Sequence, residues 1–136
     1  NVKLGYGGLA DIEFTVQVLQ LMHGYRNPRL RRANTLEALS ALVDCGILEH
    51  NQADRQRTHY LFLRNLECAL RLLSQPFSNH LPRNETGKAA LARLLGYEGE
   101  TSAALADQLM KDYAETTDEV RTFYRKTLDT LLRTSL

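Results

Sequence analysis

The sequence predicts an all-α protein, an up-and-down four-helix-type bundle with an additional short helix. Apolar residues recur at spacings of three and four along each long segment, as they do on the buried side of amphipathic helices. No segment shows the alternation of apolar and polar residues that a half-buried strand needs. The 136 residues suffice for one domain with a substantial core and are too few for two. We therefore expect a single helical domain over residues 1–136, with three long helices, one medium helix and one short one.

The first helix is predicted from residue 9 to about residue 25. Its apolar residues form two rows at i, i+4 and i+7, which are Ile12, Val16 and Leu19 in one row and Phe14, Val18 and Leu21 in the other. A helix that is apolar around most of its circumference is usually buried. We therefore expect this helix near the centre of the bundle. Pro28 prevents it from continuing through the following segment.

Two further helices are predicted in the middle of the chain. Asn34 and Glu37 have the spacing of a capping pair, and the short helix that they begin should stop at Gly46. The next helix runs from about residue 51 to residue 74. Its leucines are alternately three and four residues apart, a spacing typical of antiparallel bundles: Leu63, Leu66, Leu70 and Leu73.

The C-terminal half contains a long irregular connection, SQPFSNHLPRNETG, and two helices. A short helix is expected at residues 88–95, before Gly96. The last helix is expected from residue 101 or 102 to about residue 133, about 45 Å at 1.5 Å per residue unless it bends near Thr116 and Thr117. Its apolar stripe consists of Leu105, Leu109, Tyr113, Thr116, Val120, Phe123, Leu128 and Leu131.

The composition limits the classes of function. Seventeen basic residues against sixteen acidic ones give a net charge of +1, so no overall field would attract nucleic acid or a membrane surface. Cys45 and Cys68 lack the spacing of a metal site, which indicates reduced thiols packed inside a cytosolic protein. The sequence has neither an apolar run of the roughly 20 residues that cross a membrane nor a leader pattern. We expect a cytoplasmic protein without nucleic-acid or membrane partners.

The opening segment, KLGYGGLADIEF, raises the question of a phosphate site. In a phosphate-binding loop, glycines let backbone N–H groups converge on an anion at a helix N-terminus, and a lysine adds charge. Lys3, Gly7 and Gly8 supply these groups without the spacing of a P-loop or a dinucleotide-binding motif. The competing interpretation is structural: Gly7 and Gly8 make a tight entry turn, and Asp11 favours the helix start through the helix dipole.

The residues predict neither a metal site nor a self-contained active site. Asp11 and Glu13 lie two residues apart, which places their side chains about 200° apart around a helix and keeps them from sharing one ion. The four histidines lack the i, i+4 pairing of a zinc site, and no serine or cysteine occurs in a nucleophile motif. We assign no catalytic residue, metal or cofactor to this chain alone.

Two polar rows run along the predicted helices. Glu13, Gln17 and Gln20 form one row at i, i+4 and i+7, and Arg64, Glu67 and Arg71 form the other on the third helix. The first row must face solvent, a buried hydrogen-bond network or the surface of another domain. The second row could pair internally, at about 0.3 to 0.5 kcal/mol per pair, or meet Glu13 across the bundle.

A basic cluster follows the first helix at Arg26, Arg29, Arg31 and Arg32. Guanidinium groups at this density could receive a nucleotide phosphate or an acidic partner. The alternative is an ordinary solvated loop. Nucleic-acid binding is not indicated, because the cluster has no interleaved aromatic residues and no recognisable reading motif.

Four segments of the chain are recognisable when taken together. They are KLGYGGLADIEFTVQVLQL, NTLEAL, YLFLRNLECALRLL, and LP followed by LARLLGY. The combination resembles the helical domain of the glutamine synthetase adenylyltransferase and adenylyl-removing enzymes, and a similar domain occurs in the uridylyltransferases of the PII signalling protein. The resemblance covers nearly the whole chain, and GGLADIEFTVQ is its specific part.

The resemblance implies a piece of a larger enzyme. In that family a polymerase-β-like nucleotidyltransferase domain with metal-binding aspartates precedes the helical domain, and two such units lie in tandem. One unit transfers AMP from ATP to a tyrosine of glutamine synthetase, and the other removes it by phosphorolysis. This chain lacks the Gly-Ser and Asp-x-Asp residues of the catalytic domain. The resemblance therefore implies a noncatalytic substrate-binding or regulatory domain whose parent enzyme uses ATP and Mg²⁺.

The resemblance also suggests which side chains would face the catalytic cleft. They are Lys3, Gly7, Gly8, Glu13 and Gln17, followed by Gln20 and Arg64. An alternative is a protein-interaction bundle that docks glutamine synthetase or a PII-type signal protein without touching nucleotide. A third hypothesis is an unrelated helical scaffold.

Overall fold

The computed structural model describes residues 1–24, 34–73 and 78–134. Within these ranges the chain forms five helices and no strand, which confirms the all-α prediction. The helices are α1 (Leu9–Gly24), α2 (Thr35–Asp44), α3 (His50–Leu73), α4 (Glu85–Leu94) and α5 (Ser102–Thr134).

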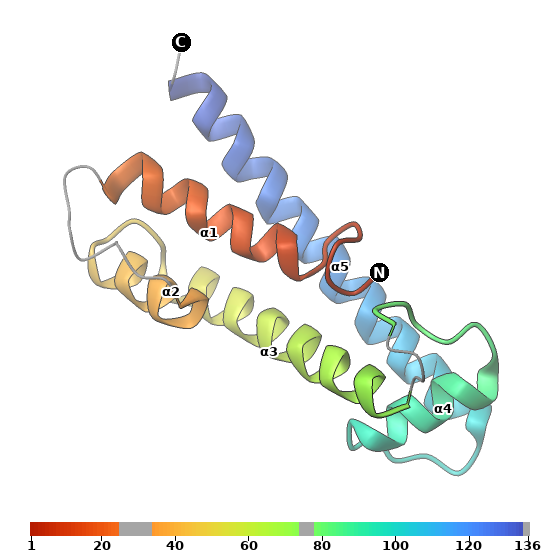
Figure 1. The fold of residues 1–136 in the computed structure, drawn as a ribbon. Helices are drawn as coiled ribbons and strands as arrows, with labels where there is room; N and C mark the ends of the chain where they lie inside the picture. Colours follow the sequence, from red (N-terminus) through yellow and green to blue (C-terminus); the bar gives the residue numbers. More distant parts are fainter. Residues whose placement is uncertain (25–33, 74–77, 135–136) are drawn as a thin grey trace.

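The three long helices form the body of the bundle (Figure 1). α1 and α3 lie side by side and run in opposite directions, and α5 packs against the start of α1 and diverges from it toward its own C-terminal end. The short helix α2 packs on α1 and α3, whereas α4 packs on α3 and α5 at the opposite end of the molecule. α5 therefore connects the α4 end of the bundle to α1.

The core consists of two buried clusters, one toward each end. The first gathers α3, α4 and the first half of α5 around the start of α1, with Leu9, Leu63, Leu66, Leu91 and Leu109 among its members. The second joins the later part of α1 to α2 and the start of α3, and Phe123 of α5 packs against it. α1 and α3 contribute to both clusters and so hold the two ends together.

The two apolar rows of α1 have different outcomes. Ile12, Val16 and Leu19 are buried as predicted, because α2, α3 and α5 cover that side of the helix. In the second row Val18 is buried at 6% exposure, but Phe14 and Leu21 are 44% and 81% exposed, so the prediction of a buried second row was wrong at these two positions. On α3, Leu73 likewise leaves the predicted buried seam and is 43% exposed, whereas the other three leucines of that seam are fully buried.

The helix ends follow capping chemistry. Asn34 accepts hydrogen bonds from the N–H groups of Leu36 and Glu37, at 2.9 and 3.1 Å, which confirms the predicted start of α2. α4 begins at Glu85, three residues earlier than expected, because the Asn84 side chain accepts from Gly87 N–H and caps the helix there.

Two peripheral features complete the fold. After α4, the Tyr97 hydroxyl donates a hydrogen bond to the Asp112 carboxylate of α5; burial, this hydrogen bond and the nearby carboxylate charge raise the pKa of Tyr97. Cys45 and Cys68 are free thiols, and Cys68 is exposed rather than packed in the interior.

No described helix is both long and apolar enough to cross a membrane.

Candidate functional site

The opening loop folds back over the start of α1. The N–H groups of Leu9 and Ala10 donate to the carbonyls of Val2 and Lys3, at 3.0 and 2.8 Å, and those of Asp11 and Ile12 donate to the Gly8 carbonyl. A phosphate loop needs N–H groups that point at its anion. Here the chain's own carbonyl oxygens accept hydrogen bonds from the first N–H groups of the helix, so these N–H groups do not point at an anion. For them the structural interpretation, a tight entry turn, is confirmed.

Gly7 and Gly8 are buried in the packing of this loop. Gly7 has φ +66°, and a Cβ on it would lie 2.6 Å from the Cα of Thr117 on α5. A Cβ on Gly8 would lie 2.6 Å from the Val2 carbonyl oxygen. Both positions therefore bring backbone segments into close contact, and only glycine fits there without displacing a neighbour.

Asp11 ties the loop, α1 and α5 together. Its Oδ2 accepts a hydrogen bond from Gly7 N–H at 2.7 Å and lies 3.2 Å from Nη1 of Arg121. Only 17% of the Asp11 side chain and 26% of the Arg121 side chain are exposed, so the ion pair is partly shielded from solvent. The contact joins residues that are 110 positions apart in the sequence.

Aromatic rings surround the same arginine. The Arg121 guanidinium lies 5.0 Å from the Tyr6 ring centre and 4.4 Å from that of Tyr124, within range for cation–π attraction. Tyr124 in turn packs against Phe14 of α1, with ring centres 5.6 Å apart. Charge and stacking thus fix the opening loop and α1 to one side of α5.

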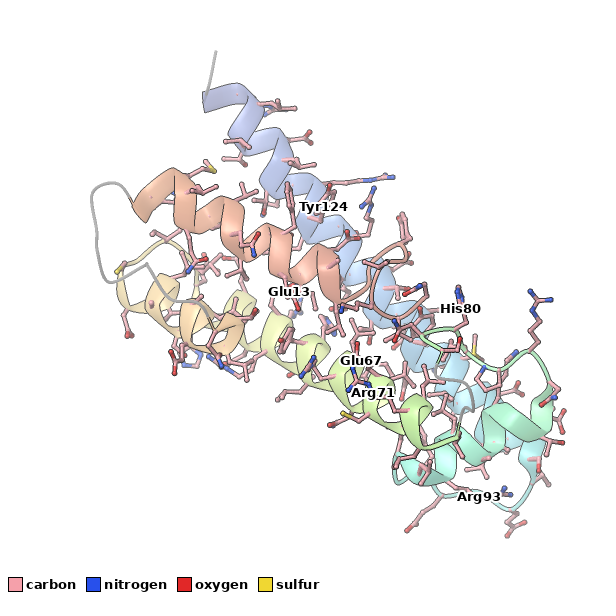
Figure 2. The ribbon with its side chains drawn as sticks, in the orientation of Figure 1. Glu13, Glu67, Arg71, His80, Arg93 and Tyr124 are labelled. Atoms are coloured by element: carbon pink, nitrogen blue, oxygen red, sulfur yellow. The ribbon has the colours of Figure 1, made fainter. Side chains whose placement is uncertain are left out.

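The acidic and amide residues of the predicted cleft row lie on another side of α1. Figure 2 places Glu13 on the side of α1 next to α3, whereas Asp11 points toward α5. These two carboxylates therefore diverge, as helical geometry requires of residues two apart. Glu13 is half-buried, Gln17 is exposed, and Gln20 is half-buried and has an interaction partner. Among the described residues, no group of three or more His, Cys, Asp or Glu could hold a metal ion.

The polar row of α3 pairs internally. Glu67 is 2% exposed, and its Oε1 lies 3.3 Å from Arg64 Nη1 and 3.7 Å from Arg71 Nη2. The two arginine side chains are 51% and 59% exposed, so they pair with the buried carboxylate while much of their own surface remains accessible to solvent. A buried carboxylate needs such partners, because leaving it unpaired costs several kcal/mol.

Most of the predicted cleft residues keep accessible side chains, but the structure does not gather all of them. Lys3 is exposed in the loop, Glu13 and Gln17 follow on α1, and Arg64 lies on α3. Gly7 and Gly8 are instead backbone packing positions. The basic cluster of Arg26, Arg29, Arg31 and Arg32 lies outside the described residues.

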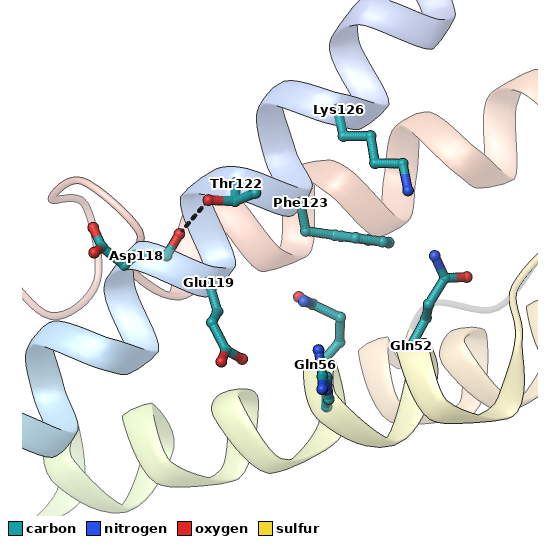
Figure 3. Close-up of a pocket in the computed structure, with 8 residues that line it drawn as sticks. Gln52, Gln56, Asp118, Glu119, Thr122, Phe123 and Lys126 are labelled. Carbon is teal, nitrogen blue, oxygen red and sulfur yellow. Dashed lines mark hydrogen bonds between the residues drawn. The ribbon is translucent and has the colours of Figure 1, made fainter.

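A pocket of about 320 Å³ between α3 and α5 was not anticipated (Figure 3). Gln52, Gln56, Phe123 and Lys126 point into the space between the two helices. Gln56 is only 4% exposed, and none of the described residues hydrogen-bonds to its side-chain amide. At the rim, Glu119 lies 2.6 Å from His59 Nε2. Helical periodicity places each residue on one face of its helix but cannot show that these faces of α3 and α5, which lie far apart in the sequence, are neighbours.

Comparison with known proteins places this architecture in a family. The family described as GlnD PII-uridylyltransferase matches residues 1–128. The chain belongs to this family. The bifunctional glutamine synthetase adenylyltransferase/adenylyl-removing enzyme of Hahella chejuensis (strain KCTC 2396) is 42% identical over 99 residues, which make up 73% of this chain and 10% of that protein.

The match to the GlnD PII-uridylyltransferase family spans the opening loop, α1 to α4 and most of α5. It therefore includes both partners of the Asp11–Arg121 contact and both walls of the α3–α5 pocket. The chain spans only a tenth of the length of the matched adenylyltransferase.

Proposed function

We propose that this chain is a noncatalytic helical domain that binds substrate or transmits regulation in a nucleotidyltransferase acting on glutamine synthetase. The observation that carries the proposal is the fixed start of α1. Asp11 is held by Gly7 and Arg121, and this arrangement leaves Lys3 and Gln17 exposed beside a rigid helix start. A rigid element that presents polar side chains suits one wall of an interdomain cleft.

The catalytic chemistry is assigned to a nucleotidyltransferase domain that precedes this one in the parent enzyme. That domain would hold ATP and Mg²⁺, and the parent would adenylylate and deadenylylate glutamine synthetase in the cytoplasm under the control of a PII-type signal protein. Asp11 and Glu13 point toward different helices and do not form a carboxylate pair, which supports placing the metal site elsewhere.

The alternative is a bundle that docks glutamine synthetase or a PII-type protein without touching nucleotide. The observation that favours it is a set of exposed apolar residues on α3, including Leu61 and Leu72 at 45% and 76% exposure. Apolar residues that gather on a surface often mark protein interfaces.

A titration of the chain with ATP and Mg²⁺, followed by backbone amide NMR, separates the two. The cleft proposal expects saturable shifts confined to residues 3–20, and a Gln17→Ala variant should weaken them while a Gln108→Ala variant on exposed α5 surface should not. Shifts confined to the α3–α5 pocket would contradict the proposed cleft. The absence of shifts at millimolar ATP would favour the docking bundle.

A further inference from the structure

α3 carries a second ridge on the side that faces away from the core. Leu61, Asn65, Cys68 and Leu72 follow one another at spacings of four, three and four, the heptad spacing of a helix that packs along a partner helix. All four are exposed, and Leu61 and Leu72 are 45% and 76% exposed. On the inner seam of the same helix, Leu63, Leu66 and Leu70 are fully buried, so the described helices cover that side of α3 and leave the ridge exposed.

The two flanks of this ridge differ in character. On one side stand Arg64 and Arg71, whose two positive charges face the single negative charge of Glu67 and leave a formal charge of +1 on the three residues. On the other side a hollow of about 270 Å³ is lined by Phe62, Asn65, Leu95, Gly96 and Tyr97. We call the ridge, the two arginines and this hollow together the outer α3 surface.

We propose that the outer α3 surface binds an amphipathic helix of a partner protein whose carboxylates flank its apolar residues. The leucines of the ridge would pack between the apolar residues of that helix, and one large apolar side chain would enter the hollow. Carboxylates on the partner would lie beside Arg64 and Arg71. Asn65, polar and at the centre of the ridge, would fix the register, because any other alignment leaves its amide against apolar groups.

Charge complementarity favours this partner over a second copy of the chain. Two copies that pack antiparallel along this ridge would place Arg64 of each copy on the side of Arg71 of the other. Like charges at such positions are destabilising. Carboxylates along the flank of a partner helix would instead attract Arg64 and Arg71. The inference deepens the docking alternative given above, which also draws on Leu61 and Leu72, by naming the chemistry of the partner; it requires neither nucleotide nor a catalytic domain.

Cys68, in the middle of the ridge, provides a direct assay. The probes are synthetic helical peptides of three heptads with leucine at the apolar positions, one cysteine in place of a central leucine, and glutamate at the flanking positions. A matched peptide carries lysine at those flanking positions. Each is equilibrated with the chain in a glutathione buffer, and intact mass with peptide mapping measures the mixed disulfide at Cys68.

We expect the glutamate peptide to form at least about tenfold more mixed disulfide than the lysine peptide, and 1 M salt to shrink this ratio. Leu72→Glu should remove the preference, while Leu21→Glu, at a position 81% exposed on α1, should leave it unchanged. Equal yields from the two peptides, or equal loss in both variants, would overturn the proposal. A Cys68–Cys68 dimer of the chain as the main product would also overturn it, in favour of a second copy.

Discussion

Asp11 and Glu67 are both carboxylates held by arginine, yet they act over different distances along the chain. Asp11 meets Arg121 from 110 residues away and fixes the opening loop to α5. Glu67 meets Arg64 and Arg71 within a single helix and joins no other element through these contacts. An arginine–carboxylate contact thus joins distant elements in one region and determines the charge of a helix surface in the other. The first should control stability, and the second should control what the surface can bind.

The largest expected effect comes from breaking the approach of the opening loop to α5. Gly7→Ala forces a side chain into the left-handed conformation and against the Thr117 backbone, so we expect a loss of roughly 3 kcal/mol in the free energy of unfolding. Gly46→Ala is the matched control, because Gly46 also has positive φ (75°) but no atom within 4 Å of an added Cβ. It should cost only about 1 kcal/mol. Urea unfolding measures both, and equal losses would contradict the close approach.

A double-mutant cycle on each ion pair tests the comparison directly. We expect Asp11→Ala and Arg121→Ala to couple by about 1 to 2 kcal/mol, because their contact is partly shielded and rings stack on the guanidinium. Glu67→Ala and Arg71→Ala should couple by only about 0.5 kcal/mol, because this contact is 3.7 Å long, the Arg71 side chain is 59% exposed, and Arg64 remains beside the carboxylate when Arg71 is removed. Both cycles are measured by urea unfolding. A larger coupling at Glu67 would reverse the assignment of roles.

The third effect concerns activity in an intact parent enzyme that contains this chain. If Glu13 contributes to the cleft, Glu13→Ala should slow adenylyl transfer about tenfold, equivalent to about 1.4 kcal/mol of activation free energy. The free energy of unfolding should change by less than about 0.5 kcal/mol, because the Glu13 side chain is only half-buried. Steady-state rates and thermal melting measure the two quantities. Glu115→Ala, on exposed α5 surface, is the control, and parallel losses of rate and stability at Glu13 would indicate a structural role.

The sequence was sufficient for the helices because helical periodicity and capping are local. Asn34 begins α2 as its pattern predicts, and Ile12, Val16 and Leu19 are buried. The same periodicity failed at Phe14, because it predicts a buried position but cannot show that only the Tyr124 ring of α5 packs there and leaves Phe14 44% exposed.

The site was less predictable, because its contacts depend on how distant helices meet. Asp11 was expected to favour the helix start, but no local pattern indicates that Arg121 completes its environment. The α3–α5 pocket was not predicted for the same reason. Gln56 and Lys126 lie far apart in the sequence, and the helical pattern of one segment carries no information about its contacts with the other. Glu67 was the exception, because its partners lie one helical turn away.

The smallest expected effect is a pH dependence at the α4 end of the bundle, where neither ion pair takes part. Burial, the hydrogen bond to Asp112 and the charge of that carboxylate raise the pKa of Tyr97, and burial raises the pKa of Tyr113 on α5. A raised folded-state pKa means that the folded chain holds the phenol proton more tightly than the unfolded chain does.

The stability from these phenols is therefore complete below the unfolded pKa of about 10 and is lost as the pH rises toward the folded value. We expect the melting temperature to fall as the pH rises above about 10, and Tyr97→Phe to flatten that fall, because phenylalanine has no proton to lose. Tyr113→Phe should flatten it less, since burial alone raises the pKa there. Melting curves at intervals from pH 8 to 11.5 measure the slopes. A Tyr97→Phe curve parallel to that of the parent chain would show that the hydroxyl of Tyr97 ionises as easily in the folded state as in the unfolded one. In that case the bond to Asp112 would not stabilise the α4–α5 contact, and the stability of this end would rest on the apolar packing of α4 against α5 alone.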